Sequence, residues 1–162
     1  MQGRSSLYRI AAVATLLLVV IGYIYQKYRI APGIEFAQLE AYNARGERVK
    51  VWQKSSRGTV VVFFASWCHD CERELPKLQR VLQGQLKGVD VVALTDEGIT
   101  TMVQYRDAMK FNFRFYSLPK DFGHYGIHAI PTIYLLNAQG ETVFTKVGDV
   151  DWNSPELSRQ LE

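Results

Sequence analysis

The chemistry of this chain is concentrated in Trp67-Cys68-His69-Asp70-Cys71, a stretch that contains both of its cysteines. An apolar run at 59–65 precedes the stretch and predicts a buried strand, and a helical pattern with leucines on one face follows it. This junction places Cys68 at a helix N-terminus, where unpaired N–H groups and the helix dipole stabilise a thiolate. A thiolate at Cys68 can attack a disulfide, and Cys71 can then resolve the mixed disulfide. The alternatives are a structural disulfide or half of a zinc site, although no second CxxC exists to complete a zinc site.

A second pattern, Ile130-Pro131-Thr132, precedes another apolar strand farther along the chain. Together with the CxxC stretch, it resembles the thioredoxin superfamily, and more narrowly the membrane-anchored TlpA/ResA group of thiol–disulfide proteins in bacterial envelopes. The resemblance runs from about Phe36 to the C-terminus. It rests on these motif residues: Phe64-Ala65-Ser66-Trp67-Cys68, Cys71, Glu74, Pro76 and Ile130-Pro131-Thr132.

The resemblance implies how a substrate is bound. Pro131 is expected in the cis form, facing the two cysteines, so that the backbone of Ile130 stays open to pair with an extended substrate strand. Trp67 is expected beside the cysteines and His128 at the rim of the substrate site. An ordinary trans proline at a strand start is the alternative for Pro131, and a core aromatic is the alternative for Trp67.

Three further residues are predicted to modulate the dithiol. A protonated His69 would lower the pKa of the Cys68 thiol, whereas the negative charge of Asp70 would oppose that effect. Either residue could instead be a solvated residue of the helix start. Glu97 aligns with an acidic residue that some members of the resembled group place near the CxxC, and its alternative is a place in the first turn of the next helix. Val62 stands where thioredoxins carry a buried aspartate.

Charge gives no indication of nucleic-acid binding. Residues 1–33 hold four of the 19 basic residues and no acid, which leaves 15 bases against 16 acids in the remainder. The overall charge of +3 therefore arises beside the N-terminal apolar run. We expect no cofactor and no resident metal. A copper site made from the two cysteines and a histidine, His124 or His128, is a minority alternative.

The N-terminal segment carries a membrane signal. Residues 10–25 form an uncharged apolar run, slightly short for the roughly 20 residues that cross a bilayer. We interpret it as an uncleaved anchor, because the run exits into Gln26-Lys27-Tyr28-Arg29 without an A-x-A-like cleavage site. A cleaved signal peptide and a buried core helix are the alternatives. Charges flank both ends, so the CxxC pair and the resemblance carry the prediction of an inner-membrane protein with its catalytic domain outside the cytoplasm.

The fold class follows from the order of elements. We predict four parts: a cytoplasmic stub at 1–9, a transmembrane anchor at 10–25, a linker at 26–35 and a thioredoxin-like domain at 36–162. The domain is α/β, a central mixed sheet flanked by helices, and the resemblance implies an added N-terminal hairpin. The predicted strands are 36–39, 48–51, 59–65, 89–95, a short one after 111–116, 132–137 and 142–147. The predicted helices are about 70–85, about 99–110, one turn at 121–125, and a last helix with Pro155 at its first position.

These residues predict an anchored thiol–disulfide oxidoreductase. Its reduced CxxC would reduce disulfides in substrate proteins, and a membrane thiol donor would reduce it again. Reduction of apocytochrome cysteines during cytochrome c maturation is the leading physiological hypothesis, suggested by the resemblance. Disulfide oxidase or isomerase activity is the nearest alternative, and a copper-binding chaperone is the alternative from another class.

Overall fold

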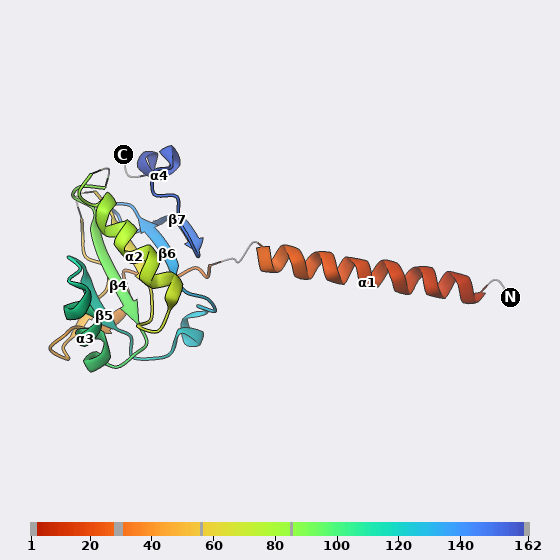
Figure 1. The fold of residues 1–162 in the computed structure, drawn as a ribbon, viewed down its shortest axis with the longest axis horizontal. Coiled ribbons are helices and arrows are strands. Elements are labelled where there is room, and N and C mark those ends of the chain that lie inside the picture. Colours follow the sequence, from red (N-terminus) through yellow and green to blue (C-terminus); the bar gives the residue numbers. More distant parts are fainter. Residues whose placement is uncertain (1–2, 28–30, 56, 85, 161–162) are drawn as a thin grey trace. The chain divides into compact units, whose positions relative to one another are not determined.

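The computed structural model describes residues 3–27, 31–55, 57–84 and 86–160. The chain divides into two compact units, residues 1–30 and residues 31–162 (Figure 1). This division lies within the predicted linker at 26–35. The predicted linker at 26–35 includes residues 28–30, which lie outside the described residues.

The first unit contains one helix, α1 (Gly3–Lys27), which covers the uncharged run and extends beyond it at both ends. Large apolar side chains along the middle of α1 are exposed: Ile10, Val13, Leu16, Leu17, Leu18, Val19, Val20, Ile21 and Tyr23. Within the ranges given above, no helix combines the length and the apolar character needed to cross a membrane.

The second unit is built on one mixed sheet of seven strands in the order β2-β1-β5-β4-β3-β6-β7. The strands are β1 (Glu40–Tyr42), β2 (Arg48–Lys50), β3 (Thr59–Phe63), β4 (Asp90–Thr95), β5 (Arg114–Ser117), β6 (Thr132–Leu136) and β7 (Thr142–Val147). β3, β4 and β5 are parallel neighbours, and the other pairs are antiparallel. The carboxyl ends of β3, β4 and β5 therefore meet at one edge of the sheet.

Alternate side chains of β3 enter two different cores, as expected for a central strand with both faces covered. Val60 and Val62 pack with both cysteines and with side chains of the helices, which are α2 (His69–Val81), α3 (Ile99–Met109) and α4 (Pro155–Arg159). Val61 and Phe63 pack on the opposite face with Phe36 and with the 3₁₀ turn η1 (Phe122–Tyr125). The predicted thioredoxin-like mixed sheet is thus confirmed, with its α-helices gathered on one face (Figure 1).

One predicted strand is misplaced. Residues 36–39 form a turn instead, in which the Leu39 N–H donates to the carbonyls of Glu35 (3.2 Å) and Phe36 (3.3 Å). The hairpin begins at Glu40, and β1 pairs with β2 in antiparallel register. The apolar residue at position 36 reflects burial of Phe36 in the second core, not the alternation of side chains along a strand.

Candidate active site

The structure places Cys68 at the N-cap of α2, as predicted. Its backbone is extended (φ −84°, ψ 104°), and its carbonyl accepts the Glu72 N–H (3.1 Å). The Cys71 N–H donates to Cys68 Sγ at 3.1 Å, so the Cys68 side chain acts as the N-cap acceptor of the helix. The Cys71 amide in the first turn of the helix therefore points at the sulfur of Cys68, and together with the helix dipole it favours a thiolate there once the pair is reduced.

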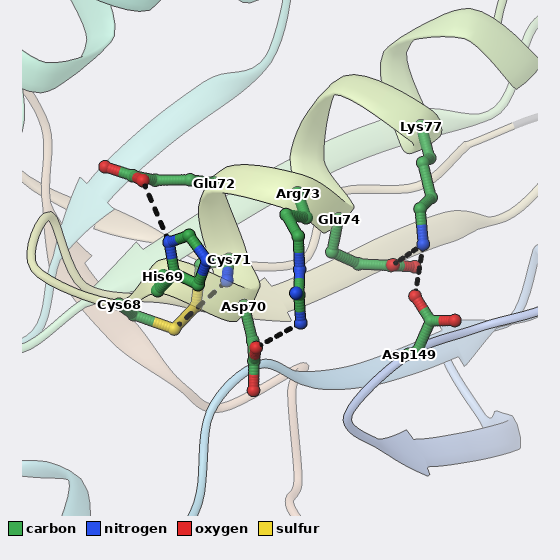
Figure 2. Close-up of polar contacts among 9 residues, drawn as sticks. All are labelled: Cys68, His69, Asp70, Cys71, Glu72, Arg73, Glu74, Lys77 and Asp149. Carbon is green, nitrogen blue, oxygen red and sulfur yellow. Dashed lines mark hydrogen bonds and ion pairs between the residues drawn. A yellow bond between two sulfur atoms is a disulfide. The ribbon is translucent and has the colours of Figure 1, made fainter.

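The two cysteines are joined as a disulfide with their Cα atoms 5.2 Å apart (Figure 2). Cys71 is completely buried, whereas Cys68 keeps 6% of its surface exposed. The difference is small, but only Cys68 can be reached from outside without moving the helix. This supports the predicted order of a Cys68 nucleophile and a Cys71 resolving thiol.

The side chains of His69 and Asp70 are exposed on the surface of the first turn of α2. His69 Nδ1 lies 3.6 Å from Glu72 Oε2, and Asp70 Oδ1 accepts from an Arg73 guanidinium nitrogen at 2.5 Å (Figure 2). Each residue is therefore paired one turn along its own helix. Exposed pairs of this kind add little stability.

Trp67 is 73% exposed, which makes the reading of a core aromatic wrong for this residue. An indole left in solvent beside a buried disulfide is an apolar surface that a partner can cover. Trp152, by contrast, is buried among core residues.

The Ile130–Pro131 peptide bond is cis, as the resemblance implied. The next residue, Thr132, is the first of β6 and pairs with Phe63, so this loop ends beside the end of β3, the strand that leads into the cysteines. The Pro131 carbonyl accepts the Gly148 N–H (2.8 Å). Among the described residues, the backbone of Ile130 makes no backbone–backbone hydrogen bond, and its side chain is half-buried. His128 is exposed on the same loop.

Glu97 does not belong to a helix start, so that alternative is wrong. α3 begins at Ile99 with Gly98 as its N-cap. Glu97 instead reaches the loop before the cysteines: its Oε2 accepts the Ser66 N–H (2.6 Å) and its Oε1 accepts the Ser66 hydroxyl (2.6 Å). It is thus brought to the site, through Ser66.

Sequence reasoning counted Glu74 as a motif residue but assigned it no role. Its side chain is 2% exposed, and its Oε1 accepts the indole N–H of Trp152 (2.6 Å) and the Val150 N–H (3.2 Å). Lys77 Nζ lies 3.3 Å from Oε2 and also contacts Asp149 (Figure 2).

Burial raises the pKa of Glu74, and a hydrogen bond with Asp149 raises it further against the opposing effects of Trp152 and Lys77. That same hydrogen bond lowers the pKa of Asp149. The signal that could have flagged Glu74 is its place three residues after Cys71, where an acid faces the buried side of the helix.

The described residues contain no cluster of three or more histidine, cysteine or acidic side chains able to hold a metal ion. His124, one of the two histidines considered for copper, has its Nε2 3.1 Å from Lys120 Nζ, and both His124 and His128 are exposed.

Comparison with known proteins agrees with this geometry. The family model of the AhpC/TSA family matches residues 31–144. The thiol-disulfide oxidoreductase ResA of Bacillus thuringiensis (strain Al Hakam) is 26% identical over 134 residues, covering 79% of this chain and 76% of the relative. The sporulation thiol-disulfide oxidoreductase A of Bacillus subtilis (strain 168) is 31% identical over 112 residues, covering 64% of this chain and 66% of the relative.

Among solved structures, StoA from Bacillus subtilis superposes with a TM-score of 0.60 at 26% identity, covering 81% of this chain and all of StoA. A secreted disulfide oxidoreductase of Mycobacterium tuberculosis shares the fold with a TM-score of 0.60 at 18% identity, covering 80% and 98% of the two chains. The chain therefore belongs to the AhpC/TSA family of the thioredoxin superfamily and is a ResA-like thiol–disulfide oxidoreductase with Cys68 and Cys71 as its cysteine pair.

Proposed function

We propose that this protein reduces disulfides in substrate proteins of the cell envelope. The observation that carries the proposal is the Cys68–Cys71 pair at the N-terminus of α2, beside the loop that contains cis-Pro131. A nucleophile stabilised by the helix, a buried resolving thiol and an open backbone segment together form what thiol–disulfide exchange requires.

In the proposed reaction the Cys68 thiolate attacks one sulfur of the substrate disulfide. The substrate S–S bond breaks, a Cys68–substrate mixed disulfide forms, and the released substrate thiolate takes up a proton. Cys71 then loses its proton and attacks the sulfur of Cys68, which expels the second substrate thiolate. Two electrons pass from the dithiol to the substrate, and the protein is left as the disulfide seen in the structure.

The substrate strand pairs with the backbone of Ile130, and Trp67 and His128 line the rim of this groove. Two observations support this placement: among the described residues the backbone of Ile130 makes no backbone–backbone hydrogen bond, and the indole of Trp67 is exposed. His69, Asp70 and Glu97 modulate the dithiol: the first two through their charge beside Cys68, and Glu97 through the loop that it holds.

We propose that α1 anchors the protein in the inner membrane, with the catalytic domain on the outer side and a membrane thiol donor that reduces the pair again. Support comes from the uncharged run at 10–25 and from the exposed apolar side chains of α1. The relatives named thiol-disulfide oxidoreductase ResA and the resemblance to the envelope group favour this location. A contribution to cytochrome c maturation is the physiological role that we propose.

The test uses the two single cysteine variants of the full chain. Cys68→Ser should abolish reduction of a protein disulfide such as that of insulin, whereas Cys71→Ser should accumulate substrates as mixed disulfides through Cys68. Limiting iodoacetamide should modify Cys68 first in the reduced wild type. Modification of Cys71 first would reverse the assigned roles. A reduction potential close to that of strong disulfide oxidants would replace the proposed reductase with an oxidase.

A further inference from the structure

The loop between β4 and α3 lies between the two halves of the proposed site. Because β3, β4 and β5 are parallel neighbours, the segments that follow them start at the same edge of the sheet. The segment after β3 leads to Cys68, and the segment after β5 leads through η1 to Ile130 and Pro131. We propose that two adjacent acids in the middle loop, Asp96 and Glu97, are positioning residues: Glu97 for the nucleophile and Asp96 for the substrate-binding loop.

Glu97 holds the loop that carries the nucleophile. Both of its carboxylate oxygens bind Ser66, one through the backbone N–H and one through the hydroxyl, each at 2.6 Å. The Thr95 hydroxyl adds a third donor to Oε2 at 3.2 Å. Ser66 lies two residues before Cys68, and the Cys68 N–H closes a turn onto the Ala65 carbonyl (3.1 Å). A movement of Ser66 would therefore move Cys68 relative to the amides of α2.

Asp96 holds the other loop. Its Oδ2 accepts the Phe122 N–H at 3.0 Å, at the first residue of η1. The Ile127 N–H bonds back to the Phe122 carbonyl (3.0 Å), and Ile127 is buried three residues before Ile130. The Phe122 ring packs edge-on against Phe63, with centroids 6.0 Å apart. The position of η1, and with it the approach to Ile130, thus depends on a bond to Asp96.

The middle loop is itself fixed to the sheet. The Ser117 hydroxyl donates to the Glu97 carbonyl (2.7 Å), and the Leu118 N–H donates to the Thr95 carbonyl (2.7 Å). Asp96 and Glu97 therefore tie the segment before Cys68 and the segment at η1 to a point on the sheet that does not take part in the reaction. This inference rests on the proposed function, because it assigns each acid to one half of the proposed exchange reaction.

The two assignments predict two separable defects. Loss of Glu97 should change the reactivity of Cys68 even toward a small reagent that needs no groove. Loss of Asp96 should leave that reactivity unchanged and should weaken only the binding of a protein substrate. A purely structural role would lower thermal stability in both variants and would alter neither property.

The experiment uses the full chain in detergent, reduced, with iodoacetamide as the small reagent and insulin as the protein disulfide. Glu97→Ala should shift the pH midpoint of Cys68 alkylation. Asp96→Ala should keep the wild-type alkylation profile and raise KM for insulin by up to about tenfold, the effect expected when one positioning hydrogen bond is lost. Asp96→Asn should restore KM, because its amide oxygen can still accept the Phe122 N–H. Asp107→Ala, an exposed acid on α3, is the matched control and should match wild type in both assays.

Should Glu97→Ala not fold, Ser66→Ala removes one of the two Glu97 bonds and should shift the alkylation midpoint in the same direction by less. The inference is overturned if the Glu97 or Ser66 variant keeps the wild-type alkylation profile, or if Asp96→Ala keeps the wild-type KM. Failure of the proposed function looks different: the wild type itself would then not reduce insulin, or would reduce it equally well as Cys68→Ser.

Discussion

Replacing Trp152 by phenylalanine tests whether the motif acid Glu74 fastens the C-terminal segment to α2. The substitution removes the indole N–H that donates to Glu74 Oε1 at 2.6 Å and leaves the Val150 N–H as the remaining donor to that oxygen. A hydrogen bond to a charged group contributes about 1.5–3 kcal/mol, and the smaller ring leaves some space unfilled. We therefore expect Trp152→Phe to lower the free energy of unfolding by about 2–3 kcal/mol.

The assay is equilibrium urea unfolding of the oxidised protein in detergent, followed by far-UV circular dichroism. For an m-value of about 1–3 kcal/mol/M, the expected loss lowers the midpoint by about 0.7–3 M. Trp67→Phe is the matched control, because Trp67 is exposed and its replacement should change stability by less than about 0.5 kcal/mol. A double-mutant cycle with Glu74→Ala should give a coupling energy of about 1–3 kcal/mol. Equal midpoints for Trp152→Phe and Trp67→Phe would refute the reasoning.

Three further predictions follow from other contacts. Gly140→Ala should destabilise the protein by about 1–3 kcal/mol in the same unfolding assay, because φ of Gly140 is +86° and a Cβ there would lie 2.7 Å from the Trp52 ring. Gly33→Ala is the control: its Cβ would meet nothing within 4 Å, and the substitution should be near neutral. The pKa of Glu74 is raised in the folded protein, so the stability that this shift contributes is complete below pH 4.5, the ordinary pKa, and declines as the pH rises through the raised pKa. The urea midpoint of Glu74→Gln should lack that decline, and equal pH profiles for the variant and the wild type would contradict the prediction. The full chain should stay with the membrane fraction after carbonate washing because of the run at 10–25, and recovery of a soluble chain beginning near residue 32 would instead reveal a cleaved signal peptide.

Local patterns in the sequence located most of the fold. Four strands are short apolar or alternating runs bounded by turn residues: β3, β4, β6 and β7. Because α2 also follows a strand directly, hydrophobic periodicity and the positions of turn residues suffice to find these elements. The ends are less exact: α2 ends at Val81, not near residue 85. The strand predicted at 36–39 failed because an apolar residue buried by tertiary packing looks the same as one that alternates along a strand.

In the candidate site, too, local motifs were predicted from the sequence and long-range contacts were not. Cys68 and Cys71 were found because their motif is local and their spacing has chemical meaning, and cis-Pro131 because Ile130-Pro131-Thr132 resembles the thioredoxin motif. The bonds that support them were not found, because they join residues far apart in the chain: 31 positions separate Ser66 from Glu97, and 78 separate Glu74 from Trp152. Which carboxylate meets which donor depends on the folded sheet, and one sequence carries no signal for that pairing.

The strand order has a consequence for the growing polypeptide. β3 is an interior strand of the sheet and all five of its residues are buried, yet one of its two neighbours, β6, starts only at Thr132. At a synthesis rate of about 5–20 residues per second, that neighbour arrives several seconds after β3 has left the ribosome. During that interval a valine-rich edge has no native partner, and such edges pair readily with other chains. The nascent protein therefore passes through a stage in which one edge of β3 is open to pairing with other chains.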